Sequence, residues 1–133
     1  MANAFGDSTE FTDQTFESVD AKGEDLNSRR FENCFFTSCS FSEASLRRAS
    51  FVDCKFIGCD LSNVQVTSAR FRDVKFLDSK LLGINWAATD SLSHLKFQKC
   101  ILNYSVFESL DLRKSIFEEC SADRKSTRLN SSH

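Results

Sequence analysis

An apolar side chain recurs at every fifth residue, and this spacing constrains the fold more than any other feature of the sequence. The series runs from Phe11 to Trp86 and resumes, shifted by one residue, from Phe97 to Phe117. A helix would scatter residues five apart around its circumference, and a flat strand would send alternate ones to opposite faces. The spacing therefore predicts a backbone that turns a corner every five residues, so that each central side chain points at one interior axis.

The residue two positions before each central residue is small or apolar in most repeats, so it also faces inward. Four such segments close a square coil of 20 residues, and we expect successive coils to stack about 4.8 Å apart. Residues 11–122 then make about five coils in which like side chains form ladders. Twelve of the fourteen phenylalanines obey the register, with Phe5 and Phe35 as the exceptions. The two predicted phenylalanine ladders are Phe36, Phe56, Phe76 and Phe31, Phe51, Phe71.

The segments ASFVD-CKFIG-CDLSN and CILNY-SVFES-LDLRK-SIFEE resemble the repeats of the pentapeptide repeat protein family. The resemblance covers residues 31–122, and residues 9–30 more weakly. It implies an all-β fold, a right-handed quadrilateral β-helix, in agreement with the spacing. The segment SKLLGINW, followed by the break in register, is similar to the branch of the family that includes Qnr-type quinolone-resistance proteins.

Two irregularities define the expected boundaries. Ala21 takes a central position, and Glu24 and Arg29 take inward ones, so the first coil and residues 1–10 before it are expected to form a frayed end. Asp90 would point inward if the register continued through Leu92. Residues 87–94 are therefore predicted to leave the coil as a loop.

The last eleven residues, DRKSTRLNSSH, match an in-frame translation of a standard sequencing-library adapter. Residues 123–133 are therefore interpreted as a non-native tail and set aside. On this interpretation the chain is a truncated fragment whose natural sequence continues past Ala122.

The six cysteines all stand at the inward position two before a central residue. Their five-residue spacing is that of the repeat and differs from the spacing of zinc ligands. Stacking places Cys34 over Cys54 within reach of a disulfide, but parallel side chains and a reducing compartment favour free thiols. His94 has no nucleophile or carboxylate cluster nearby. No catalytic, metal-binding or cofactor-binding residue is predicted, and the chain is not expected to be an enzyme.

Charge is distributed unevenly along the chain. Without the tail, 14 basic and 18 acidic residues give a net charge of −4. Residues 1–26 hold seven acidic residues and one lysine, whereas residues 27–86 hold nine basic and six acidic residues, a net of +3. The N-terminus has no signal peptide, and no apolar run approaches the roughly 20 residues of a membrane span, so a cytoplasmic protein with no membrane partner is predicted.

Stacking gathers basic residues on the outer surface. One interpretation is a solvated face in which Asp53 and Asp73 form weak pairs with these residues. The other is an interaction surface for an anionic partner, bordered by a small apolar strip of Phe35, Ile57 and Leu77. The candidate surface residues are Arg30, Lys55, Arg70, Arg72, Lys75 and His94.

The leading functional hypothesis is a non-enzymatic scaffold that binds a macromolecule. The family resemblance implies protection of a type II topoisomerase, DNA gyrase or topoisomerase IV, by DNA mimicry, and a homodimer formed through the missing C-terminus. The positive charge of residues 27–86 opposes DNA mimicry. The alternative is a structural or adaptor module of a longer protein. Neither hypothesis requires a cofactor or direct binding to nucleic acid.

Overall fold

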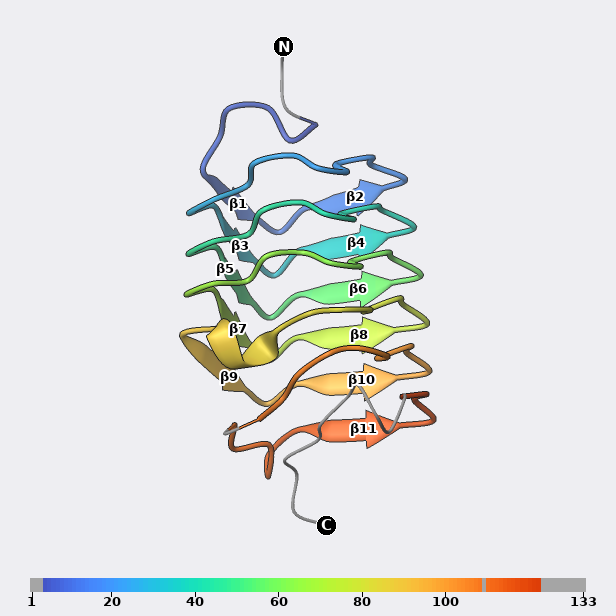
Figure 1. Ribbon diagram of the computed structural model, residues 1–133. Coiled ribbons are helices and arrows are strands. Elements are labelled where there is room, and N and C mark those ends of the chain that lie inside the picture. The colour runs from blue at the N-terminus through green and yellow to red at the C-terminus, as the bar shows by residue number, and fades with distance from the viewer. Residues whose placement is uncertain (1–3, 109, 123–133) are drawn as a thin grey trace.

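The computed structural model describes residues 4–108 and 110–122 and shows short parallel strands stacked coil upon coil (Figure 1). The first side of the rod is a five-stranded sheet of β1 (Glu10–Thr12), β3 (Arg30–Glu32), β5 (Ser50–Val52), β7 (Arg70–Arg72) and β9 (Ser91–Ser93). The second side is a six-stranded sheet of β2 (Thr15–Glu17), β4 (Phe35–Thr37), β6 (Lys55–Ile57), β8 (Lys75–Leu77), β10 (Lys96–Gln98) and β11 (Ile116–Glu118).

Single parallel bridges hold the other two sides together, in columns that begin with the pairs Asp20–Ser40 (third side) and Asp25–Ser45 (fourth side). In most of the stack each residue pairs with the residue 20 positions further on, as in Phe31 with Phe51. The predicted quadrilateral β-helix is confirmed. Among the described residues, no helix is long and apolar enough to cross a bilayer.

The corners between sides are made by residues in the left-handed region of backbone space. Asp53, Gly58 and Asp73 have φ angles of 55°, 61° and 55°. A residue with positive φ stands two positions after nearly every central residue. Only glycine adopts this conformation freely, and asparagine and aspartate tolerate it better than most residues. No described residue with positive φ is β-branched. The polar residues that alternate with the apolar ones therefore set the corners as well as the solvent surface.

The interior consists of aromatic stacks. The Phe36 and Phe56 ring centroids lie 4.6 Å apart at an interplanar angle of 10°, and those of Phe31 and Phe51 lie 4.9 Å apart at 3°. Rings on adjacent sides meet edge to face, as Phe31 and Phe36 do at 69°. Both arrangements suit the ring quadrupole. Both predicted ladders are confirmed, and the one on the second side extends to Phe16, Phe36, Phe56, Phe76, Phe97 and Phe117.

The prediction that residues 87–94 leave the coil is wrong. Trp86–Ala88 form a single 3-10 turn, η1, and β9 follows it and pairs with β7 so that Phe71 lies opposite Leu92. The coil here simply has 21 residues, and the turn takes up the extra one while remaining against the stack (Figure 1). Asp90 is nevertheless exposed, because the turn directs its side chain outward to Arg70.

The expectation of a frayed N-terminal end is also corrected for residues 4–30. The Phe5 ring is only 7% exposed and lies parallel to the Phe41 ring at 5.8 Å, so it fills the space that the small side chain of Ala21 leaves empty. The Glu24 carboxylate accepts a hydrogen bond from the Ala4 N–H, and the Arg29 guanidinium donates one to the Gly6 carbonyl. The residues that looked irregular in sequence therefore hold a cap over the end of the rod.

Phe5 and Ala21 are expected to behave as one unit in a double-mutant cycle. Phe5→Ala should lower the free energy of unfolding by about 3 kcal/mol, because it uncovers the terminal rings. Ala21→Phe alone should cost about 1–3 kcal/mol, since two rings would compete for one space. The double variant should regain most of the stability. Urea unfolding of the four proteins measures the coupling, and strictly additive losses would show that the Phe5 ring does not occupy that space.

Candidate interaction surface

Three lysines open three successive strands on the second side of the rod. Lys55, Lys75 and Lys96 begin β6, β8 and β10 and lie opposite one another in register. Like charges at strand spacing, roughly 4.8 Å between Cα atoms, repel one another. An arrangement that places them side by side therefore favours an anion in front of them.

The lysine column lines a groove of about 650 Å³ at the corner between the first and second sides. Phe35 stands at one end of the column and Ile116 at the other, and their side chains are exposed. The opposite wall is made by corner residues of successive coils. We call this hollow the corner groove, and its polar and apolar walls are formed by Phe35, Asp53, Lys55, Asp73, Lys75, His94, Lys96, Lys114 and Ile116.

Local partners satisfy the charges of the corner groove unequally. The Lys96 ammonium lies 3.5 Å from the Glu118 carboxylate, and the Lys55 ammonium lies 5.5 Å from the centre of the Phe35 ring. Lys75 forms no ion pair with any residue that the structure describes. At a partly exposed site, a cation–π contact contributes roughly 0.5–1 kcal/mol, so both Lys55 and Lys75 remain available to a partner.

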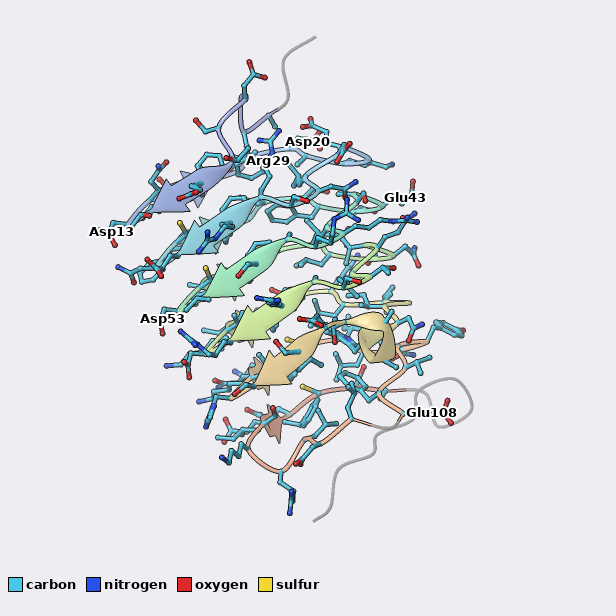
Figure 2. The ribbon with its side chains drawn as sticks, turned by 90° about the vertical axis from the view of Figure 1, so that its left-hand side faces the viewer. Asp13, Asp20, Arg29, Glu43, Asp53 and Glu108 are labelled. Atoms are coloured by element: carbon cyan, nitrogen blue, oxygen red, sulfur yellow. The ribbon has the colours of Figure 1, made fainter. Side chains whose placement is uncertain are left out.

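The structure separates the six predicted surface residues. Lys55, Lys75 and His94 line the corner groove, and the His94 imidazole Nδ1 lies 2.7 Å from the Ser93 hydroxyl. Arg30 and Arg70 lie at the opposite edge of the first side. Figure 2 views this side, with the Asp13 and Asp53 corner at the left edge and Arg29 nearer the middle, beyond the other end of the strands.

Arg72, the remaining predicted residue, lies between these two edges. It stands at the end of β7, where its guanidinium is 3.8 Å from the Asp73 carboxylate. Both side chains are largely exposed, so solvent screens the pair.

Two lysines of the corner groove were missed from the sequence. Lys96 directly precedes Phe97, as Lys55 precedes Phe56, and this signal was present in the resumed register. Lys114 follows Leu112 by two residues, which is the corner position that His94 takes after Leu92. Both lysines were missed because the prediction stacked residues 20 positions apart, whereas one coil has 21 residues and shifts all later positions by one.

The predicted apolar strip is only partly formed. Ile57 and Leu77 pair in register on β6 and β8, but both side chains are partly covered. Phe35 belongs to another column, at the start of β4, and is 42% exposed. The apolar surface of this corner is therefore concentrated at the two ends of the lysine column.

The repeat, its coils and its corners also identify the family. The sequence matches the Pentapeptide repeat region over residues 29–91 and again over residues 51–126. The chain is a pentapeptide repeat protein. No curated protein matches its sequence.

Solved structures similar to this pentapeptide repeat protein include one that supports the same fold. A trypsin-treated form of QnrB1, a plasmid-mediated fluoroquinolone resistance protein, superposes with a TM-score of 0.50 at 15% identity over 89% of this chain. This chain spans 66% of the length of that one. A pentapeptide repeat protein from the cyanobacterium Cyanothece 51142 gives a TM-score of 0.42 at 11% identity, covering 92% of each chain, and full-length QnrB1 gives 0.42 at 17%, covering 92% of this chain and 85% of that one.

The cysteines of this pentapeptide repeat protein bond to the backbone of the neighbouring coil. The Cys54 thiol donates to the Phe31 carbonyl at 3.4 Å, and the Cys59 thiol donates to the Phe36 carbonyl at 3.3 Å. All six thiols are free. Within the described residues, no group of three His, Cys, Asp or Glu side chains could hold a metal ion. A thiol thus fits the inward position because it is small and can donate to the coil before it.

Thiol reactivity should separate Cys120 from the rest. Burial raises the pKa of Cys54 to about 12, so at pH 8 it stays protonated and unreactive. Cys120 is only half-buried, and a hydrogen bond from the Cys100 thiol lowers its pKa. Iodoacetamide at pH 8 should therefore modify Cys120 first and all six cysteines after unfolding in urea. Peptide mass spectrometry measures the order, and early labelling of Cys54 would contradict its burial.

Proposed function

We propose that this pentapeptide repeat protein is a non-enzymatic scaffold that binds an acidic, extended segment of a partner protein in the corner groove. The observation that carries the proposal is the lysine column of Lys55, Lys75 and Lys96 with Phe35 and Ile116 at its ends. The lysines in the middle of the groove would contact acidic side chains of the partner. The apolar side chains at its ends would contact apolar ones.

The dimensions of the groove suit a short segment. From Phe35 to Ile116 the column makes four steps between strands, roughly 19 Å at 4.8 Å per step. About six residues in extended conformation span that length. The preferred sequence has an acidic middle facing the lysines and a large apolar residue at each end.

The scaffold itself supplies preorganisation. The lysines stand on strands whose next residues, Phe56, Phe76 and Phe97, are fully buried and stacked on one another. The lysine side chains can therefore change rotamer, while the backbone that carries them stays fixed. Little ordering of the backbone is then required on binding, which lowers the entropic cost of association.

The proposal is tested with a fluorescein-labelled hexapeptide that has four central glutamates and a phenylalanine at each end. Lys75→Gln should weaken binding on the order of fivefold, equivalent to about 1 kcal/mol. Lys80→Gln is the matched control, because Lys80 has the same place in its repeat but lies on the third side. Fluorescence anisotropy at low and high salt measures both. Equal effects of the two substitutions would show that the peptide does not bind in the corner groove.

A second candidate function is protection of DNA gyrase or topoisomerase IV by DNA mimicry. Its support is the acidic first coil, where Glu10, Asp13, Glu17 and Asp20 face solvent, as Figure 2 shows for Asp13 and Asp20. The QnrB1 structure is described as that of a fluoroquinolone resistance protein. The lysine column in the middle of the rod opposes the resemblance to DNA.

The second candidate is tested by gyrase supercoiling in the presence of a fluoroquinolone. DNA mimicry through the first coil predicts that the protein restores supercoiling and that Asp13→Asn with Asp20→Asn removes the effect. If supercoiling is not restored at micromolar protein, this function is excluded. The scaffold proposal is tested separately, by the peptide experiment. The alternative of a purely structural or adaptor module predicts neither peptide binding nor protection.

A further inference from the structure

A second hollow, of about 540 Å³, lies at the edge of the first side that is opposite the corner groove. Its residues come from three successive coils in which the order of two residue types alternates. The sequence reads Ser-x-Arg, then Arg-x-Ser, then Ser-x-Arg. We call this site the arginine–serine hollow, and it is lined by Ser28, Arg30, Arg48, Ser50, Ser68, Arg70 and Asp90.

The fold turns this alternation into a checkerboard. Arg30, Ser50 and Arg70 lie opposite one another in the register of β3, β5 and β7. The corner residues two positions earlier, Ser28 and Arg48 among them, have φ angles of 65° and 57° and form the second column. Arg70 therefore has serines on both sides in its own column, whereas Arg30 lies between Ser50 and Glu10.

The charge in the arginine–serine hollow is poorly balanced. Three guanidinium groups face a single carboxylate, that of Asp90, which gives a net charge of +2. Asp90 lies 2.8 Å from the Arg70 Nε, so it occupies one arginine. The Arg48 Nε donates to the Ser28 hydroxyl at 3.4 Å, and the Arg30 side chain has no ion pair within the described part of the chain. Among the residues that the structure describes, Arg30 and Arg48 therefore form no ion pair, although Glu10 lies opposite Arg30 on β1.

We propose that the arginine–serine hollow is a binding site for a phosphate group that carries two negative charges, as in a phosphorylated side chain or a nucleotide. Guanidinium groups match phosphate oxygens in pairs, and serine hydroxyls donate to the remaining oxygens. The checkerboard brings both types of donor to one surface. The lysines of the corner groove act as point charges instead, so the two sites on either edge of the first side have different chemistry.

The test titrates the full chain, labelled with ¹⁵N, with inorganic pyrophosphate and follows the Nε–H signals of the arginine side chains by NMR. The signals of Arg30 and Arg48 should shift and saturate with a Kd on the order of 1 mM, because the site is open to solvent. Sodium sulfate at equal ionic strength should shift them less, since its total charge is lower and its oxygens are weaker hydrogen-bond acceptors. ADP and a phosphoserine hexapeptide, titrated in the same way, distinguish a nucleotide from a phosphorylated protein as the source.

Three substitutions decide the assignment. Arg48→Asn keeps a residue that tolerates positive φ and should abolish saturation. Arg47→Gln is the matched control, because the neighbouring Arg47 guanidinium points instead to the Gln65 carboxamide, at 3.2 Å. Asp90→Asn releases Arg70 and should tighten binding roughly threefold. Equal loss in the Arg47 and Arg48 variants, or weaker binding after Asp90→Asn with unchanged backbone spectra, would overturn the proposal.

Discussion

The whole structure depends on one constraint, the closure of a coil in a fixed number of residues by left-handed corners. When every fifth residue turns the chain, four segments return it to its starting side, and backbone amides then meet carbonyls of the coils before and after. Corner residues such as Asp53 and Asn63 tolerate the required φ, and the hydrogen bonds between coils fix the register. The stacks of phenylalanine rings follow from this closure, because it places like residues one above another.

Columns on the surface are the counterpart of stacks in the interior. A side chain that occurs once per coil becomes a line of charge or of apolar surface parallel to the rod axis. The lysine column arises in this way on the second side, and the arginine–serine checkerboard arises from two columns that alternate out of phase. The acidic first coil gives the rod two electrostatically different parts. A charged partner would therefore bind the first coil and the middle of the rod with different affinities.

The fold, the ladders and the family could be predicted from the sequence because a period of five leaves few alternatives. Prediction failed where a residue acts out of register. Phe5 lies outside every repeat, and only the structure shows that it fills the space above Phe41. The inserted residue near Trp86 reads as a loop in sequence, since its absorption by a 3-10 turn depends on geometry. Half of the predicted surface lines one groove, but the role of Lys96 required the true stacking offset, and that of Arg48 required the position of the corner residues.

The pairing of residues 20 positions apart also bears on how such a chain can change during evolution. Duplication of one coil, for example residues 50–69, would lengthen every column by one side chain while leaving the corners and both ends as they are. The lysine column would gain one positive charge in a single genetic event, without a new side chain having to be selected. Surface charge in this architecture can therefore change by whole coils, and binding strength with it, at little risk to the fold.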